Sequence, residues 1–135
     1  MSVIGFNITK IDAERKNVPK AKVNVESNVN IKQVEVSKVS LGNDNEKVLD
    51  FNFEFKTNYS PDIGHIMVSG NLLFLTKSET AKKIAEEWKK TKKLEKEIMK
   101  PVFNTVLARG NIQALIISKD LNLPAPIQLP RMKDN

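Results

Sequence analysis

The chain has 135 residues, a formal net charge of +6 at pH 7 and no cysteine. This length suggests one domain with a core of its own, and the lack of cysteine excludes disulfides and thiolate chemistry and fits a reducing cytoplasm. The first residues show neither the basic segment nor the apolar segment of a signal peptide, and no apolar run approaches the roughly 20 residues of a membrane span. We therefore expect a soluble, cytoplasmic protein.

The first half of the chain predicts β-strands. Residues 2–11 alternate apolar and polar side chains and predict a first strand. The polar residues 12–20 are too many for a tight hairpin turn and predict a crossover loop. A second strand is expected over residues 21–41, where the apolar positions change phase near residue 32 and again near residue 37. Each change of phase predicts a bulge, because a strand otherwise keeps one face buried.

Two further strands follow, and both have a strong apolar face. Residues 46–59 give the clearest alternation, with four apolar side chains on one side: Leu49, Phe51, Phe53 and Phe55. Residues 64–76 predict a fourth strand with one face made of Ile66, Val68, Leu72 and Phe74. Its other face carries Met67, Leu73 and Leu75, so we expect both faces to be covered. A single helix layer covers only one face of the sheet, so the second apolar face predicts oligomerisation.

The last third predicts two helices. Thr76 followed by Glu79 has the spacing of a capping box and predicts a helix start. Apolar residues then recur at steps of three and four, as in one helical stripe. Pro101 lacks a backbone N–H, so the two helices are expected to meet near residues 99–101, the second ending near Ser118.

Four strands followed by two helices predict an α+β fold, a four-stranded antiparallel sheet with two C-terminal helices. We expect a single domain over residues 1–135, with the sheet and its crossover loop in 1–76, the helices in 77–120 and an extended tail in 121–135.

The charge is concentrated in one segment. Residues 82–100 contain eight Lys and four Glu, whereas residues 102–130 contain only three charged side chains. Many charges of the first segment are spaced to pair at i,i+4, which favours a solvated helix face over a nucleic-acid footprint, since Trp88 is the one aromatic residue there. A basic nucleic-acid-binding module stays open as a disfavoured alternative. The apolar segment is typical of surface that is buried against a partner or holds one.

The sequence offers little for catalysis. His65 is the only histidine, and without cysteine it can build neither a zinc site nor a nucleophilic triad. The carboxylates are scattered, and the five glycines are isolated rather than grouped in a phosphate-binding loop. We therefore expect a binding protein without metal or cofactor, not an enzyme.

The order of elements and the second helix resemble the SecB family of export chaperones. In that family the helix has a Phe-Pro-type start, a Ser-Arg-Gly step and a Leu-Asn-Leu-Ala-Pro exit. The corresponding segments here are Lys100-Pro101-Val102-Phe103, Ala108-Arg109-Gly110 and Leu121-Asn122-Leu123-Pro124-Ala125-Pro126-Ile127. The element order covers nearly the whole chain, whereas the motifs are confined to residues 100–127.

The resemblance implies an ATP-independent chaperone, a holdase that binds unfolded or precursor polypeptides in apolar grooves. The implied client-binding residues lie at the crossover loop, the second helix and its exit: Ile11, Val18, Pro19, Phe103, Leu107, Ile112, Leu115, Ile116, Leu121 and Leu123. The family also implies a homo-oligomer, a dimer of dimers, and the expected interface residues are Trp88, Leu94, Ile98, Met67 and Leu73.

The chain also departs from the family. SecB is acidic, whereas this chain is basic with a short tail, which puts coupling to a SecA-type motor in doubt. A toxin–antitoxin-associated SecB-like chaperone therefore stays open beside the general holdase, as does a small-ligand carrier that uses the Phe-lined face of the sheet.

Overall fold

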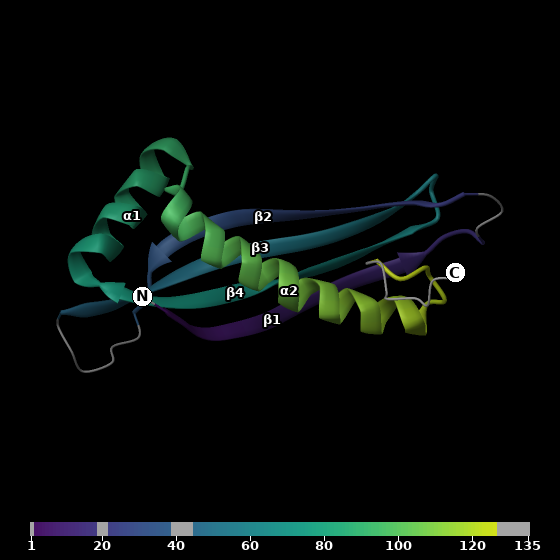
Figure 1. The fold of residues 1–135 in the computed structure, drawn as a ribbon, viewed down its shortest axis with the longest axis horizontal. Coiled ribbons are helices and arrows are strands. Elements are labelled where there is room, and N and C mark those ends of the chain that lie inside the picture. Colours follow the sequence, from purple (N-terminus) through teal and green to yellow (C-terminus); the bar gives the residue numbers. More distant parts are fainter. Residues whose placement is uncertain (1, 19–21, 39–44, 127–135) are drawn as a thin grey trace, which may run out of the picture.

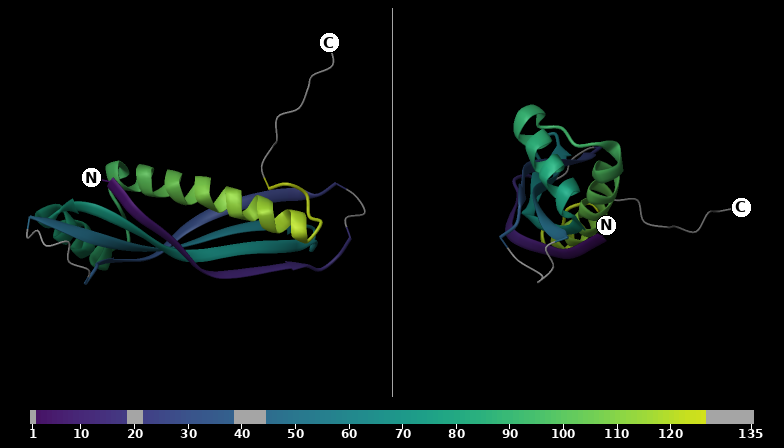
Figure 2. Two further views of the ribbon diagram at one scale, coloured as in Figure 1. Left: turned by 90° about the horizontal axis from the view of Figure 1, so that it is seen from below. Right: turned by 90° about the vertical axis from the view of Figure 1, so that its left-hand side faces the viewer.

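The computed structural model describes residues 2–18, 22–38 and 45–126. Four strands are followed by two helices (Figure 1): β1 (Ser2–Arg15), β2 (Asn24–Val36), β3 (Glu46–Ser60), β4 (Gly64–Lys77), α1 (Ser78–Thr91) and α2 (Lys96–Asp120). The strands form one antiparallel sheet in the order β1-β4-β3-β2. Both helices lie on the same face of this sheet, and α2 crosses it diagonally (Figures 1 and 2). The predicted α+β fold class is confirmed.

The core lies between the helices and the two central strands. Every second residue of β3 and β4 is buried under the helix layer, as the alternation predicted, with Leu49, Phe51, Phe53 and Phe55 of β3 opposite Ile66, Val68, Leu72 and Phe74 of β4. Burying a side chain of this size stabilises a fold by about 1.5–3 kcal/mol. We call this helix-covered side of the sheet the inner face and the other side the outer face.

α2 lies very close to the sheet at Gly110. A Cβ atom there would lie 2.6 Å from Cγ of Phe55, so any larger residue would push the helix away. The buried residues of α2 recur at every fourth position: Ile98, Val102, Val106, Gly110, Ala114 and Ser118. The second half of this stripe consists of small residues, which let the helix backbone lie near the sheet.

The edge strands differ in length from the prediction. Residues 12–15 were expected in the crossover loop but extend β1, since Ala13 pairs with Ile66 and Arg15 with Gly64. β2 covers residues 24–36, so residues 22, 23, 37 and 38 of the predicted strand lie outside it, whereas residues 21 and 39–41 are not among the described residues. The bulge predicted near residue 32 is confirmed by a register shift between Ile31 and Gln33, whereas residue 37 lies beyond the end of the strand.

The predicted capping box is wrong. α1 begins at Ser78 with Lys77 as its N-cap and without a side-chain cap hydrogen bond. Thr76 is still part of β4, where it pairs with Lys47, and its side chain is 3 % exposed. Because Thr76 is buried as a residue of β4, its side chain does not cap the helix.

The junction of the helices also lies elsewhere. The chain leaves α1 at Lys92, which adopts a left-handed φ of 57° and donates its N–H to the Trp88 carbonyl oxygen at 2.9 Å. Pro101 is accommodated inside α2, which continues to Asp120. No helix of the described segments is both long and apolar enough to cross a lipid bilayer.

Candidate functional site

The helix layer covers the central strands of the inner face and leaves the edge strands partly bare. Directly paired residues of an antiparallel sheet point to the same face. Ile11 of β1 pairs with Val68 of β4, so both face the helices, yet Ile11 is 49 % exposed and Val68 is 0 % exposed. Val3 and Ile8 also pair with inner-face positions of β4 and are exposed. We call Val3, Ile8 and Ile11 the β1 strip.

The other edge shows a weaker form of the same contrast. Val29 of β2 pairs with Phe55 of β3, and Phe55 is fully buried whereas Val29 is only half-buried. Val25 and Ile31 occupy the same face of β2 and are half-buried as well. We call Val25, Val29 and Ile31 the β2 strip.

The reason for both strips is geometric. The outer strands of a four-stranded sheet lie about 14 Å apart, and a helix with its side chains is about 10 Å wide. α2 alone therefore cannot cover all four strands along most of their length, and α1 covers only one end of the sheet (Figure 1).

The two flanks of α2 differ in chemistry. Successive helical residues turn by about 100°, so the residues before and after each member of the buried stripe lie on opposite flanks. Arg109 precedes Gly110, and its guanidinium carbon lies 5.7 Å from the centre of the Phe6 ring on β1. That contact places the Arg109 flank on the side of β1. The flank toward β2 carries the apolar Phe103, Leu107 and Leu115, with Leu107 42 % exposed, and the polar Asn111 lies between Leu107 and Leu115.

The β1 side has an aromatic contact that fixes its position. Phe6 stacks on Phe53 with 4.9 Å between the ring centres. β4 lies between the strands that carry these two rings, and a Cβ on its Gly70 would collide with the Asn7 carbonyl oxygen. The lack of a side chain at Gly70 thus lets β1 lie against β4 and lets Phe6 reach the core.

A cavity of about 590 Å³ lies where the chain leaves β1 for β2. Its walls combine apolar side chains with two lysines: Lys16, Asn17, Val18, Lys22, Val23, Pro61 and Ile63. The backbone N–H groups of Lys16 and Asn17 donate to the Ile63 carbonyl oxygen at 2.8 and 3.2 Å, which holds this wall in place. The cavity lies directly before β2 and thus extends the apolar surface of that edge.

The predicted client-binding residues are distributed over several surfaces. Ile11 belongs to the β1 strip, Val18 lines the crossover cavity, and Phe103, Leu107 and Leu115 form the β2-side flank of α2. Ile112 and Ile116 lie two positions after Gly110 and Ala114, so they are exposed on the solvent side of α2, away from both strips.

The exit from α2 differs from the expectation. Leu123 is 7 % exposed and belongs to the core, and Leu121 is half-buried against it, so neither offers much surface to a client. Pro19 lies outside the described residues. Sequence reasoning missed Val3, Ile8 and the whole β2 strip. Their alternation was visible in the sequence, but it does not say which strands lie at the edges.

Three of the expected interface residues are core residues. Trp88, Leu94 and Ile98 are at most 9 % exposed and pack within the subunit. They stabilise the subunit itself and leave little surface for the predicted oligomer contact. Met67 and Leu73 are half-buried on the outer face of β4 and keep part of their apolar surface exposed.

Leu75 also lies on the outer face, and the remaining contacts there are mostly polar. The Asn71 side-chain amide donates to both carboxylate oxygens of Asp50 at 3.2 and 3.3 Å. Lys32 and Glu54 form an ion pair at 3.5 Å across β2 and β3, and His65 lies 3.5 Å from Asp12. The outer face therefore differs strongly from the apolar edges of the inner face.

Tyr59 anchors the segment after α2. Its hydroxyl donates to the Pro124 carbonyl oxygen at 2.8 Å, and burial raises the pKa of Tyr59 to about 12. The chain turns back toward the sheet at Asn122, which has a φ of 53°. This turn places Leu123 in the core. Within the described segments no three His, Asp or Glu side chains are grouped to hold a metal ion.

Comparisons with known proteins give one structural match. No family model matches the chain, and no curated protein sequence matches it. A solved structure of a SecB-like chaperone from Mycobacterium tuberculosis, in complex with a ChAD peptide from the antitoxin HigA1, is similar with a TM-score of 0.55 and 9 % sequence identity. The match covers 99 % of this chain and 91 % of that chain. At this identity the likeness shows a shared SecB-like fold.

Proposed function

We propose that this protein is an ATP-independent holdase that binds unfolded polypeptides on the inner face of its sheet. The observation that carries the proposal is the exposure of apolar residues on both edge strands. Ile11 and its neighbours on β1 face the helix layer but are not covered by it, whereas their partners on β4 are buried. Folded monomers rarely leave such adjoining apolar surface without a use.

The binding surface consists of the β1 strip, the β2 strip, the β2-side flank of α2 and the crossover cavity. Apolar contact contributes about 25 cal/mol per Å² of surface removed from water, and it requires no particular sequence in the client. Several separate apolar surfaces on one subunit let an extended chain make many weak contacts at once. Such binding needs neither a nucleotide nor a catalytic group.

The SecB-like fold supports this proposal, because the similar mycobacterial protein is a chaperone in complex with a peptide. We further propose a homo-oligomer in which Met67 and Leu73 of the outer face take part in subunit contacts, as their half-buried apolar side chains would favour. Light scattering should then give a mass above that of the 15.2 kDa chain, with a tetramer as the expected assembly. A monomer at micromolar concentration would contradict this part of the proposal.

Two matched pairs of variants test the binding surface. Leu107→Lys places a charge on the β2-side flank of α2, and Asn104→Lys places the same charge on the exposed side of that helix. Ile11→Lys and Asn7→Lys form the corresponding pair on the inner and outer faces of β1. Aggregation of a chemically unfolded client is measured by light scattering at equimolar chaperone.

We expect the wild-type protein to slow aggregation, the Leu107→Lys and Ile11→Lys variants to lose most of this effect, and the two control variants to keep it. Circular dichroism confirms that all four variants are folded. A wild-type protein that leaves aggregation unchanged would overturn the proposal. Equal losses in the test and control variants would overturn the assignment of the surface.

A narrower function is a chaperone dedicated to an antitoxin. It is suggested by the peptide bound to the similar mycobacterial protein, which comes from an antitoxin. A panel of unrelated unfolded clients separates the two, because a dedicated chaperone protects one partner and leaves the others to aggregate. Binding of nucleic acid, suggested by the charge of +6, would instead weaken steeply with salt.

A further inference from the structure

The charged side chains of the sheet are sorted by face. Direct pairing places every acidic residue of the four strands at an outer-face position: Asp12, Glu14, Glu26, Glu35, Glu46, Asp50 and Glu54. The inner-face positions carry two charged residues, Arg15 opposite Gly64 and Lys47 opposite Thr76, and both are basic. Since paired residues point to the same face, the strands contribute positive charge but no carboxylate to the inner face.

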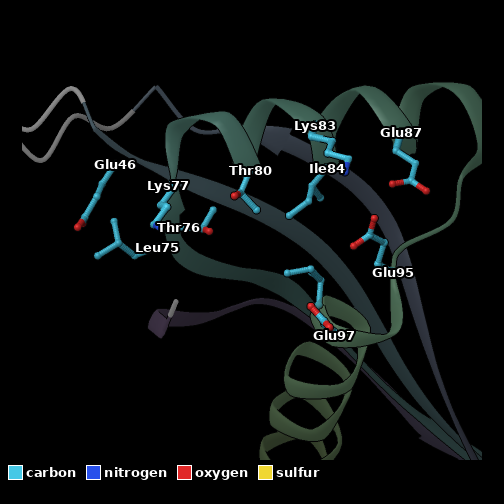
Figure 3. Close-up of a pocket in the computed structure, with 11 residues that line it drawn as sticks. Glu46, Leu75, Thr76, Lys77, Thr80, Lys83, Ile84, Glu87, Glu95 and Glu97 are labelled. Carbon is cyan, nitrogen blue, oxygen red and sulfur yellow. The ribbon is translucent and has the colours of Figure 1, made fainter.

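The acidic side chains of the helix layer gather at the α1 end of the sheet. Figure 3 shows three of them around a cavity of about 470 Å³ between α1 and the start of α2: Glu87, Glu95 and Glu97. α2 runs from there toward the end of the sheet where β1 leaves it (Figure 1). After Pro101 this helix has only three charged residues, Arg109, Lys119 and Asp120. Asp120 lies two positions after Ser118 of the buried stripe and is therefore on the solvent side of α2.

Two arginines lie beside the β1 strip without a carboxylate partner. The guanidinium carbon of Arg109 lies 5.7 Å from the centre of the Phe6 ring, which places its charge over β1. Arg15 lies further along β1 than Ile11 and on the same face. Both arginines are exposed, and the ion pairs within the described residues involve neither of them. A ligand on the β1 strip therefore meets two positive charges that the protein itself does not neutralise.

The β2 side combines apolar surface and positive charge in the same way. Lys22 lines the crossover cavity together with apolar side chains, and no ion pair of the described residues involves it. Lys16, the other lysine of this cavity, lies 3.6 Å from the exposed carboxylate of Asp62 and is partly neutralised. Lys119 ends the β2-side flank of α2. Both edges of the inner face therefore present basic groups next to apolar side chains.

We propose that the binding surface selects unfolded segments in which apolar residues are interspersed with aspartate or glutamate, and disfavours segments rich in lysine or arginine. The proposal rests on the holdase function and names its class of client. Apolar client side chains lie on the β1 and β2 strips, and neighbouring client carboxylates interact with Arg15, Arg109 and Lys22. Because each exposed ion pair contributes little, the preference arises from several such contacts along one client segment.

Nucleic acid fits this surface less well than a polypeptide does. Proteins that bind single strands rely on aromatic side chains on which the bases stack. Of the eight aromatic residues of the chain, six are buried in the core. The other two, Phe6 and Phe103, are half-buried, and Phe6 is already stacked on Phe53. The basic groups therefore adjoin aliphatic surface, which suits apolar side chains better than bases.

Fluorescence anisotropy with the full chain measures the preference directly. Three labelled peptides share the same leucine, phenylalanine and glycine residues, and their remaining positions are all aspartate, all asparagine or all lysine. We expect the aspartate peptide to bind about tenfold more tightly than the asparagine peptide, as several exposed ion pairs together would provide. The lysine peptide should bind most weakly, and added salt should reduce the differences. Equal affinities for the three peptides would overturn the proposal.

Two double variants locate the charges. Arg15→Gln with Arg109→Gln removes two positive charges beside the β1 strip, and Lys10→Gln with Lys56→Gln removes two from the outer face. The readout is the ratio of the affinities for the aspartate and asparagine peptides. We expect this ratio to fall several-fold in the first variant and to change less than twofold in the second. Equal falls would reveal diffuse attraction by net charge and overturn the proposal.

A conservative variant separates charge from side-chain shape. Arg15→Lys with Arg109→Lys keeps both positive charges, so we expect an affinity ratio close to that of the wild type. A fall as large as that of the glutamine variant would attribute the effect to lost packing of the arginines and overturn selection by charge. Circular dichroism confirms that all of these variants are folded.

Aggregation assays on the same preparations keep this question separate from the holdase function. A protein that protects clients but binds the three peptides equally is a holdase without the charge preference. A protein that neither protects clients nor binds any peptide contradicts both proposals. A labelled oligothymidine serves as the nucleic-acid probe, and we expect it to bind more weakly than the aspartate peptide. Tighter binding of the oligothymidine would assign the basic surface to nucleic acid and overturn the proposal.

Discussion

The central and edge strands of the inner face contain similar residues but have different environments. Phe55 on β3 and Val68 on β4 are fully buried beneath the helices, whereas Ile11 on β1 is 49 % exposed although it points the same way. Side-chain direction is set by the alternation of each strand, and cover is set by where the helices lie. Apolar residues in the centre therefore stabilise the fold, and those at the edges remain available for binding.

The largest effect on stability is expected at the centre. Phe55→Ala removes a fully buried ring beneath Gly110 and leaves a cavity between β3 and α2. A substitution of this kind destabilises a protein by about 3–5 kcal/mol. Urea denaturation followed by circular dichroism measures the change. A loss below about 1 kcal/mol would show that α2 does not pack on the centre of the sheet.

A smaller effect is expected where the exit of α2 is tied to β3. Tyr59→Phe removes the hydrogen bond to the Pro124 carbonyl oxygen. One such bond contributes about 1 kcal/mol to folding stability. Denaturation at neutral pH should reveal this loss, and faster amide exchange of residues 121–126 should accompany it. Unchanged amide exchange would show that Tyr59 does not hold this segment in place.

The same tyrosine predicts a pH dependence. Burial raises the pKa of Tyr59 from 10.0 to about 12, so the folded state favours the neutral phenol. Its contribution to stability is therefore full below pH 10 and is lost as the pH rises through about 12. The free energy of unfolding should fall less steeply in this window for Tyr59→Phe than for the wild type. Parallel curves of unfolding free energy against pH for the two proteins would contradict the burial of the Tyr59 phenol.

At the edge, loss of stability should be slight. Ile11→Ala shortens a side chain that is half in water in the folded protein. We expect a loss of about 1 kcal/mol or less, well below that for a buried isoleucine, together with a clear loss of holdase capacity. Denaturation and aggregation assays on the same preparation measure both. A loss comparable to that of Phe55→Ala would mean that the β1 strip is covered in the native protein.

The smallest effect is expected on the outer face. Lys32→Gln removes the ion pair with Glu54, in which the lysine is largely exposed. Pairs of this kind contribute about 0–1 kcal/mol, so stability should change by a few tenths of a kcal/mol. Client protection should remain at the wild-type level. A loss of client protection would indicate that clients bind on the outer face.

Regular alternation was the most reliable guide to the fold in the sequence. Phe51, Phe53 and Phe55 predicted both the strand and its buried side, because a strand with period two allows only two choices of face. Local signals for helix ends were poorer. Pro101 suggested a break between the two helices, but the structure has this break at Lys92 and keeps Pro101 inside α2. Thr76 has the spacing of a helix N-cap, but it is still paired in β4.

The binding surface was only partly predictable, because exposure depends on tertiary cover. Leu107 and Leu123 are both leucines in the apolar C-terminal segment, yet one is exposed on a flank of α2 and the other lies in the core. Only the direction of α2 across the sheet and the turn at Asn122 decide between them. The exposure of the β2 strip likewise depends on elements far apart in the sequence.

Methyl NMR spectra recorded while an unfolded, aggregation-resistant client is titrated would test the account most directly. The methyl groups of Ile8, Ile11, Val29 and Leu107 report on the edges of the inner face and the flank of α2, and those of Met67 and Leu73 report on the outer face. We predict that client binding shifts or broadens the first group and leaves the second unchanged. Changes confined to the outer face, or no changes at saturating client, would contradict binding on the uncovered edges of the sheet.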